Sequence, residues 1–206
     1  MKTECAPVQI EFTGLGRRKV LGTFDGGLIS SDGGAVLLRE VDARLGITEK
    51  LAACFTDYHD PDLIEHDLLA LVRQGVYGVA LGYEDFDDHD DLKWEPLWAV
   101  ALNKKDLEGQ ARHREADRGK VLASSSTLNR LELSDADEAA ESRYKKMAHD
   151  PENWKRFSSM YSSIRLPKRP RRSCWTLTRR TTRCMAIRRV SFFTATTAAI
   201  ATCLCT

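Results

Sequence analysis

The acidic side chains of this 206-residue chain all lie in its first 160 residues, and this segregation limits which part of the chain can fold as an ordinary domain. Residues 1–160 carry 30 acidic and 21 basic side chains, whereas residues 161–206 carry ten basic and no acidic ones. The second segment also lacks Gly, Asn and Gln, and it holds nine Thr and four of the six Cys. Such a break indicates either a basic binding arm or a stretch that was not selected as protein.

The length and composition of the chain fit one soluble globular domain, with or without an appendage. No apolar run approaches the roughly 20 residues that a membrane span needs, and residues 1–5 do not resemble a signal peptide. We therefore expect a cytoplasmic protein that has no membrane partner. In a cytosolic chain of this size, six cysteines favour free thiols or metal ligands over a disulfide framework.

Hydrophobic spacing predicts a fold that is mainly α, with a small β element at the N-terminus. Two short strands are expected at 9–13 and 19–24, joined by a basic turn. In the helix expected at 35–45, we expect Val36, Leu37, Val41 and Leu45 to lie mostly on one face. Further helices are expected at 48–55, 61–81, 96–102, 126–133 and 136–147, and from 151 onward. The polar and basic residues 103–125 are expected to form a loop.

Seven basic side chains are candidates for DNA-phosphate contacts, on the basis of charge alone. Three lie in the turn between the two strands and four in the 103–125 loop: Arg17, Arg18, Lys19, Arg112, Arg114, Arg118 and Lys120. Neither GxGxxG nor GxxxxGK[ST] is present, and a merely exposed turn explains the first group equally well. The run 124–126 has no partnering His-Asp pattern, so Ser126 is better explained as a helix cap than as a nucleophile.

Two clusters could in principle bind metal ions, and neither has a convincing spacing. Residues 84–91 contain six carboxylates and His89, but they lack the EF-hand pattern. We favour a solvated loop that caps the next helix, because carboxylates prefer helix N-termini. Cys203-x-Cys205 with Cys174 and Cys184 is a poor match to the paired knuckles of structural zinc sites. We therefore assign no metal-binding residue.

Five segments carry a resemblance to a known family. They read DGGLISSDGGAVLLREVD at 25–42, CFTD at 54–57, RQGVYGVALGYED at 73–85, DHD at 88–90 and STLNRLE at 126–132. In order and spacing they resemble the N-terminal region of bacterial insertion-sequence transposases of the DDE domain group 1 type. The similarity extends over about residues 10–165.

The resemblance implies a helical N-terminal region followed by an RNase H-like α/β core. In that core three acidic residues hold two Mg²⁺ ions for DNA strand cleavage and transfer. The family's first catalytic aspartate lies in a buried strand that reads approximately LDLDATDDPLHG, which is expected just after residue 165. This sequence has no such segment there, and the core is expected to be truncated. We therefore assign no catalytic residue and expect Mg²⁺ in the intact family enzyme, not in this chain.

The genetic code explains what stands in place of that strand. Trp175 is encoded by TGG and Thr176 begins with AC, so the frame one nucleotide earlier reads GAC, which is Asp. Across Met185 and Ala186 that frame reads GGC, which is Gly, and permitted codons for residues 173–186 can spell the missing aspartate segment. We infer that the chain leaves the transposase frame near residues 166–171. A genuine basic nucleic-acid arm is the alternative.

The sequence therefore divides into N-terminal strands and turns at 1–30, a helical transposase region at 31–165 and an out-of-frame, unstructured basic tail at 166–206. The predicted function is that of a catalytically inactive fragment of a DDE transposase, whose parent binds transposon-end DNA. One alternative is a non-catalytic DNA-binding or inhibitory module, which self-associates or pairs with the full-length transposase. Another is half of an active enzyme that is completed by programmed frameshifting.

Overall fold

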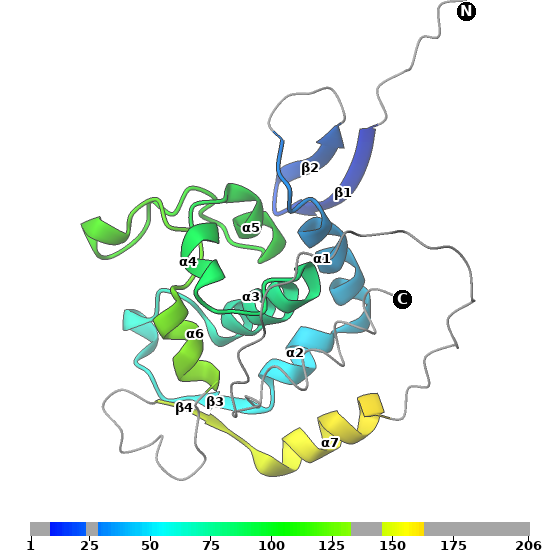
Figure 1. The fold of residues 1–206 in the computed structure, drawn as a ribbon, viewed down its shortest axis with the longest axis vertical. Helices are drawn as coiled ribbons and strands as arrows, with labels where there is room; N and C mark the ends of the chain where they lie inside the picture. Colours follow the sequence, from blue (N-terminus) through cyan, green and yellow to red (C-terminus); the bar gives the residue numbers. More distant parts are fainter. Residues whose placement is uncertain (1–8, 24–28, 133–145, 163–206) are drawn as a thin grey trace, which may run out of the picture.

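The computed structural model describes residues 9–23, 29–132 and 146–162 and confirms a mainly helical chain with a β element at its start (Figure 1). The helices are α1 (Gly34–Leu45), α2 (Ile47–Ala52), α3 (Leu68–Leu81), α4 (Asp88–Leu92), α5 (Pro96–Ala101), α6 (Ser125–Glu132) and α7 (Pro151–Ser162), with 3-10 turns η1 (Pro61–Leu63) and η2 (Glu115–Asp117). Antiparallel pairs are formed by strands β1 (Gln9–Leu15) with β2 (Arg18–Thr23), and β3 (Phe55–Asp57) with β4 (Met147–His149). The tail from residue 166, with its expected disorder, lies outside the described residues.

The helices in the described ranges include none that is both long enough and apolar enough to cross a membrane. The helices predicted at 35–45, 96–102, 126–133 and from 151 are confirmed to within one residue as α1, α5, α6 and α7. Gly46 ends α1 in the left-handed conformation, at φ 62°. Its position follows the sequence signal for a helix stop.

The predicted N-terminal strands form the hairpin β1–β2, which polar contacts fasten to α1. The backbone N–H and the hydroxyl of Thr13 donate to the Glu40 carboxylate at 2.9 and 2.6 Å. Nη2 of Arg39 donates to the carbonyl oxygens of Thr13 and Gly14 at 2.9 and 3.2 Å. A two-stranded hairpin is marginally stable alone, so these contacts fix its basic turn relative to the helices.

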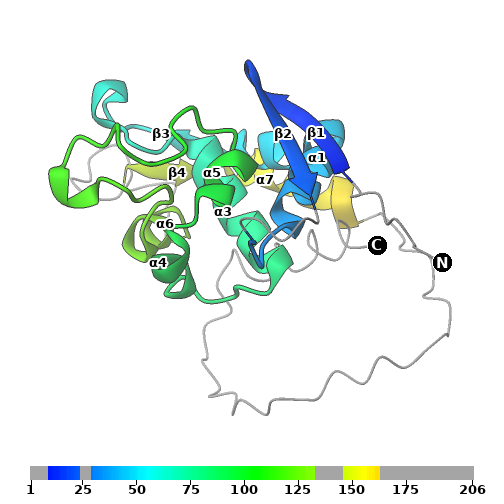
Figure 2. The same ribbon diagram turned by 90° about the horizontal axis from the view of Figure 1, so that it is seen from above.

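Helix α3 lies at the centre of the molecule, with α1 and α2 on one side and α4 and α6 on the other (Figures 1 and 2). Its residues Val72 and Val76 are fully buried, and so is Trp98 of α5. These side chains belong to one hydrophobic cluster that also takes in residues of α1, α2, α6 and α7. Burial of this apolar surface is the main stabilising contribution to the fold.

Two buried aspartates tie the helices together. Asp32, just before α1, accepts hydrogen bonds from the Trp98 indole Nε1 and the Tyr83 hydroxyl, both at 2.9 Å. Asp42 accepts one from the Tyr77 hydroxyl of α3 at 3.1 Å. Since buried polar groups need partners, these contacts set which face of α1 turns inward.

The buried face of α1 consequently differs from the predicted one. Leu37 and Leu45 are exposed, whereas Arg39 and Asp42 are buried. Only Val36 of the expected apolar face is fully buried. The polar partners on neighbouring elements outweigh the apolar periodicity of the helix, and local periodicity carries no information about those partners.

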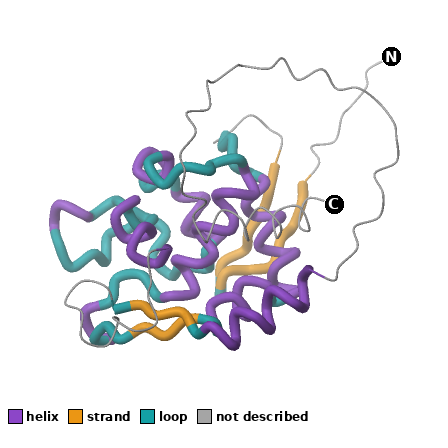
Figure 3. The backbone as a smooth tube through the Cα atoms, turned by 60° about the horizontal axis from the view of Figure 1, so that its bottom comes forward, coloured by secondary structure: helices purple, strands orange, loops and turns teal. Residues whose placement is uncertain are grey.

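The pair β3–β4 is a second sheet that the sequence does not predict (Figure 3). The helix predicted at 48–55 ends at Ala52, and Phe55 pairs in β3 with His149. The helix predicted at 136–147 is wrong at its end, because Met147 begins β4; residues 133–145 lie outside the described residues. Phe55 and Met147 are buried, so a contact between distant segments overrides the local helical pattern here.

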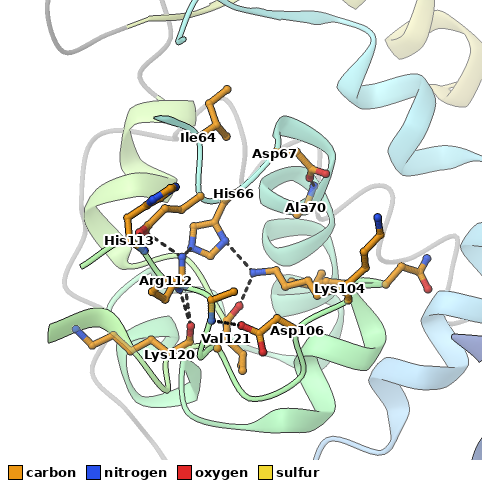
Figure 4. Close-up of a pocket in the computed structure, with 16 residues that line it drawn as sticks. Ile64, His66, Asp67, Ala70, Lys104, Asp106, Arg112, His113, Lys120 and Val121 are labelled. Atoms are coloured by element: carbon orange, nitrogen blue, oxygen red, sulfur yellow. Dashed lines mark hydrogen bonds and ion pairs between the residues drawn. The ribbon is translucent and has the colours of Figure 1, made fainter. Parts of the chain in front are cut away.

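The single helix predicted at 61–81 is divided. Asp60 caps only the short turn η1 by accepting from the Asp62 N–H at 3.1 Å. Ile64 then adopts an extended conformation, and Asp67 caps α3 by accepting from the Ala70 N–H at 2.6 Å. The residues between the two caps leave the helix axis, which places His66 against the loop between α5 and α6 (Figure 4).

Candidate nucleic-acid interface

Arg112 holds the loop between α5 and α6 in shape. Its Nε donates to the Lys120 carbonyl oxygen at 2.9 Å, and its Nη2 donates to the Lys120 and Leu122 carbonyl oxygens at 2.8 and 2.9 Å. Its Nη1 donates to Glu65 Oε2 at 3.1 Å, and the side chain is only 9% exposed. Although its charge suggests a phosphate contact, these bonds give the guanidinium a structural role.

The ring of His66 lies between two basic side chains (Figure 4). Its Nε2 is 2.6 Å from Arg112 Nη1 and its Nδ1 is 2.8 Å from Lys104 Nζ. A guanidinium can only donate, so Nε2 accepts and the ring proton resides on Nδ1. Nδ1–H then donates to Lys104, whose amine must be neutral to accept it. Lys104 in turn donates to the Val121 carbonyl oxygen.

The electrostatics of this cluster agree with that hydrogen-bond pattern. The pKa of His66 is lowered to about 2, mainly by burial, and the positive charges of Arg112 and of Lys104 when it is protonated act in the same direction. Burial also lowers the pKa of Lys104 to about 7, with the Arg112 charge adding to the effect. The cluster lines a cavity of about 400 Å³, but Arg112 and His66 use their hydrogen-bonding groups within the chain. We therefore regard it as a structural clasp.

The other end of the same loop is fixed by α3 and α4. The Gln74 side chain exchanges two hydrogen bonds with the Ala123 backbone, both at 2.9 Å. Asp90 Oδ2 accepts from the Ser125 hydroxyl at 2.7 Å. Helix α6 begins at Ser125, so Ser126 lies in its first turn and is not the cap that the sequence predicts.

Between the clasp and α6 lies a hollow of about 240 Å³, which we call the basic groove. Its lining contains five basic and two acidic side chains together with three hydroxyls: Lys93, Arg112, Arg114, Lys120 and Arg130; Glu65 and Asp117; and Ser124, Ser126 and Thr127, with His66 and Leu122 completing it. The excess of positive charge and the hydroxyl donors match a phosphate-bearing ligand.

Ion pairing leaves two groove cations available. Lys120 Nζ is 2.6 Å from Asp117 Oδ1, and Lys93 Nζ is 3.4 Å from Asp90 Oδ1. Arg114 and Arg130 are both exposed, and neither guanidinium group makes a hydrogen bond or ion pair with any residue that the structure describes. These two guanidinium groups are therefore the groove's free donors for an anionic ligand.

The basic groove continues toward the β3–β4 pair. A neighbouring hollow of about 510 Å³ shares residues of both charges with it, among them Arg114, Arg130, Glu65 and Asp117. To the lining it adds Lys146 and His59 together with the acidic Asp57 and Asp60. Together the two hollows form a surface longer than one phosphate group needs. The neighbouring hollow carries four acidic side chains against three Lys or Arg side chains, so the excess of positive charge is confined to the basic groove.

The structure brings only part of the predicted DNA-contact set together. Arg112, Arg114 and Lys120 line the basic groove, and Arg118 is exposed beside it but does not line it. Arg17, Arg18 and Lys19 lie apart on the β1–β2 turn, where all three are exposed and Arg18 Nη1 donates to the Lys105 carbonyl oxygen at 3.2 Å. Lys93 and Arg130 were not predicted, because nothing in the local pattern indicates that α4 and α6 meet the loop.

The solvated acidic loop that the sequence favours is confirmed only for residues 84–87, which precede a helix and in which Glu84, Asp85 and Asp87 are exposed. Residues 88–92 form α4, and His89 is buried with its Nδ1 3.4 Å from Gln74 Nε2. Asp90 contacts α6 instead of capping its own following helix. Within the described ranges, no three His, Cys, Asp or Glu side chains converge as metal ligands, so these residues do not fit a Mg²⁺ site. The four cysteines of the zinc alternative lie outside those ranges.

A family model described as transposase DDE domain group 1 matches residues 12–164. Comparison of the chain with curated proteins and with solved structures gives no match.

Proposed function

The chain belongs to the DDE domain group 1 transposases, and we propose that it serves as a DNA-binding part of that system and does not itself cut or join DNA. The observation that carries the DNA-binding part is the basic groove with two guanidinium groups, Arg114 and Arg130, that are unpaired among the described residues. Membership of the family gives the ligand class, and the groove provides a surface of matching charge.

The basic groove is better suited to contacts with the phosphate backbone of DNA than to recognition of bases. Its lining offers guanidinium groups at the surface and the hydroxyls of Ser124, Ser126 and Thr127, which hydrogen-bond to one another and are common partners of phosphate oxygens. Phosphate contacts fix how a protein lies on DNA, whereas base contacts specify sequence. We therefore propose that the groove positions the strand and contributes affinity that does not depend on sequence.

The proposal that this chain does not catalyse strand cleavage or transfer rests on its reading frame. The codons of Trp175 and Thr176 place an aspartate in the frame one nucleotide earlier, at the position where the family resemblance calls for the first catalytic acid. Two-metal strand transfer needs that carboxylate to hold Mg²⁺. A chain that reads Trp-Thr there lacks the ligand.

The binding proposal is tested by a salt titration on duplex DNA with the full chain. The double variant Arg114→Gln/Arg130→Gln should bind more weakly at every salt concentration, and its slope of log affinity against log salt should be shallower by about 1 to 2. Arg44→Gln/Arg156→Gln removes the same charge from exposed positions on α1 and α7, outside the groove, and should change the slope far less. Equal effects of the two double variants would contradict the groove as the binding surface.

The catalytic part of the proposal has a separate test. The purified chain should neither nick nor join labelled transposon-end DNA in the presence of Mg²⁺ or Mn²⁺. Metal-dependent cleavage that persists after residues 163–206 are removed would contradict it. Sequencing the gene across the codons for residues 166–171 would distinguish a simple insertion or deletion from a slippery site, which would favour programmed frameshifting.

A further inference from the structure

Trp94 is 54% exposed in the short connection between α4 and α5, although a tryptophan is strongly stabilised by burial. Trp98, four residues later, is fully buried. The backbone around Trp94 is nevertheless held in place, since the Val121 N–H donates to the carbonyl oxygen of the preceding residue, Lys93, at 2.6 Å. The backbone that carries the exposed ring is therefore fixed.

Gly119 packs against the indole ring of Trp94. A Cβ atom at position 119 would lie 3.2 Å from Trp94 Cζ3, and the backbone there has φ +88°, which other residues rarely adopt. A side chain at this position would meet both a steric and a conformational penalty. Gly119 thus keeps the loop backbone close to the ring while much of the indole stays exposed.

The ring lies at the rim of the basic groove. Lys120 Nζ is 5.9 Å from the centroid of the Trp94 ring, and both Lys120 and Lys93 line the groove. The exposed aromatic surface therefore adjoins the basic groove, whose guanidinium groups Arg114 and Arg130 we propose for phosphate contacts. An aromatic ring beside a row of cations is the arrangement by which proteins bind single-stranded nucleic acid, with bases stacked on the ring and phosphates on the cations.

We propose that Trp94 stacks against an unpaired base of a DNA strand whose phosphates lie in the basic groove. This inference rests on the proposed DNA-binding function and narrows it to strands with an unpaired base, such as a single strand, a frayed end or an extruded nucleotide. Bases inside a duplex stack on one another and present no free face to the indole. The charges around the ring favour this occupant over an apolar protein segment, which would have to desolvate Lys93 and Lys120.

The test compares full-length variants on a single-stranded oligonucleotide and on the matching duplex. Trp94→Ala should weaken single-strand binding by roughly tenfold, the range expected for one lost base stack, and should change duplex binding less than about twofold. Trp94→Phe should keep most of the affinity, because a smaller aromatic ring still stacks. Leu37→Ala, which shortens an exposed apolar side chain on α1, is the control and should change neither.

A crosslinking experiment on the unaltered protein gives an independent readout. An oligonucleotide with one 5-iodouracil should crosslink to Trp94 on irradiation, and mass spectrometry of the peptide should distinguish Trp94 from the buried Trp98. Loss of binding through Arg114→Gln/Arg130→Gln, with no effect of Trp94→Ala and no crosslink at Trp94, would overturn the stacking proposal and leave the proposed function standing. If the native chain bound neither oligonucleotide, both proposals would be contradicted.

Discussion

The ring of His89 lies directly against Gly78, so closely that a Cβ atom at position 78 would come within 2.5 Å of His89 Cε1. Through this contact α4 packs against the central helix α3. Both residues belong to segments that carry the family resemblance, RQGVYGVALGYED and DHD. A glycine in mid-helix costs about 0.5–1 kcal/mol relative to alanine, and here it is required by the close approach of a buried ring.

Gly78→Ala is therefore expected to be strongly destabilising despite the better helix propensity of alanine. The added methyl would displace His89 and separate α4 from α3, at a cost of about 2–4 kcal/mol in the free energy of unfolding. Gly33→Ala is the matched control, since a Cβ at position 33 meets nothing within 4 Å and φ is −50° there. Urea denaturation should show a large loss for the first variant and little change for the second.

The contact between Asp32 and Trp98 gives a second stability prediction. Trp98→Phe would remove the indole N–H that donates to Asp32 Oδ2, and it would leave a cavity in a fully buried site. A cost of about 2–4 kcal/mol is expected from the lost volume and the unpaired carboxylate oxygen. Trp94→Phe makes the same chemical change at an exposed ring and should cost less than about 1 kcal/mol. Similar losses for the two variants would show that the Asp32 contact is unimportant.

Arg112→Lys tests the structural role assigned to that side chain. A lysine cannot reproduce the bonds to the Lys120 and Leu122 carbonyl oxygens while also reaching Glu65, so buried acceptors would lose partners. The expected loss is about 2–4 kcal/mol in thermal or urea unfolding. Arg118→Lys, at an exposed position in the same loop, should have no measurable effect. A variant that folded normally but bound DNA poorly would instead place Arg112 in the binding surface.

The folded chain should lose stability as the pH falls below about 6.5, the ordinary pKa of histidine. His66 keeps a pKa of about 2 in the folded state, so at pH 5 the unfolded chain binds a proton there that the folded chain does not. The free energy of unfolding then decreases by up to about 1.4 kcal/mol per pH unit for this group. Burial lowers the pKa of His89 as well, which adds a slope of the same sign.

His66→Gln should make that pH dependence shallower, because a glutamine does not titrate. Exposed His113→Gln should leave the slope unchanged. The measurement is urea denaturation at several pH values between about 5 and about 7. Lys104 gives the same direction of pH dependence at higher pH. Its pKa is about 7 in the folded state, below the ordinary value near 10.4, so the free energy of unfolding rises with pH between these two values. A slope that His66→Gln did not alter would contradict the proton assignment in the clasp.

Most helices could be predicted because their signals are local. The helix stop at Gly46 and the Asp-Pro start before α7 depend on neighbouring residues only. The β3–β4 pair could not be predicted in this way, because the buried positions of Phe55 and Met147 depend on a contact across about 90 residues of sequence. The division of the helix at 61–81 likewise follows from His66, which contacts Arg112 and Lys104 in a distant loop.

The sequence predicts the region of the chain that contains the candidate site, but not which of its side chains are available to a ligand. Charge in the 103–125 loop drew attention to Arg112, Arg114 and Lys120, which do line one groove. Charge alone does not distinguish Arg112, whose side chain is 9% exposed and bonded within the chain, from Arg114, whose guanidinium has no partner among the described residues. It also gives no indication of Arg130, which belongs to the groove only because α6 packs beside the loop.

Removal of residues 163–206 should separate two contributions to DNA affinity. The ten basic side chains of that segment should bind any DNA through counterion release, with a steep salt dependence and no preference for sequence. The truncated chain should therefore bind more weakly and with a shallower salt slope, by up to about nine if all ten charges contact phosphates. The effects of Arg114→Gln/Arg130→Gln and of Trp94→Ala should persist in it, because those side chains lie in the folded part. The measurement is a salt titration of both lengths on transposon-end and scrambled DNA. If truncation abolished the preference for the ends but spared the bulk affinity, the basic segment would be a recognition element, and its assignment to an out-of-frame reading would be wrong.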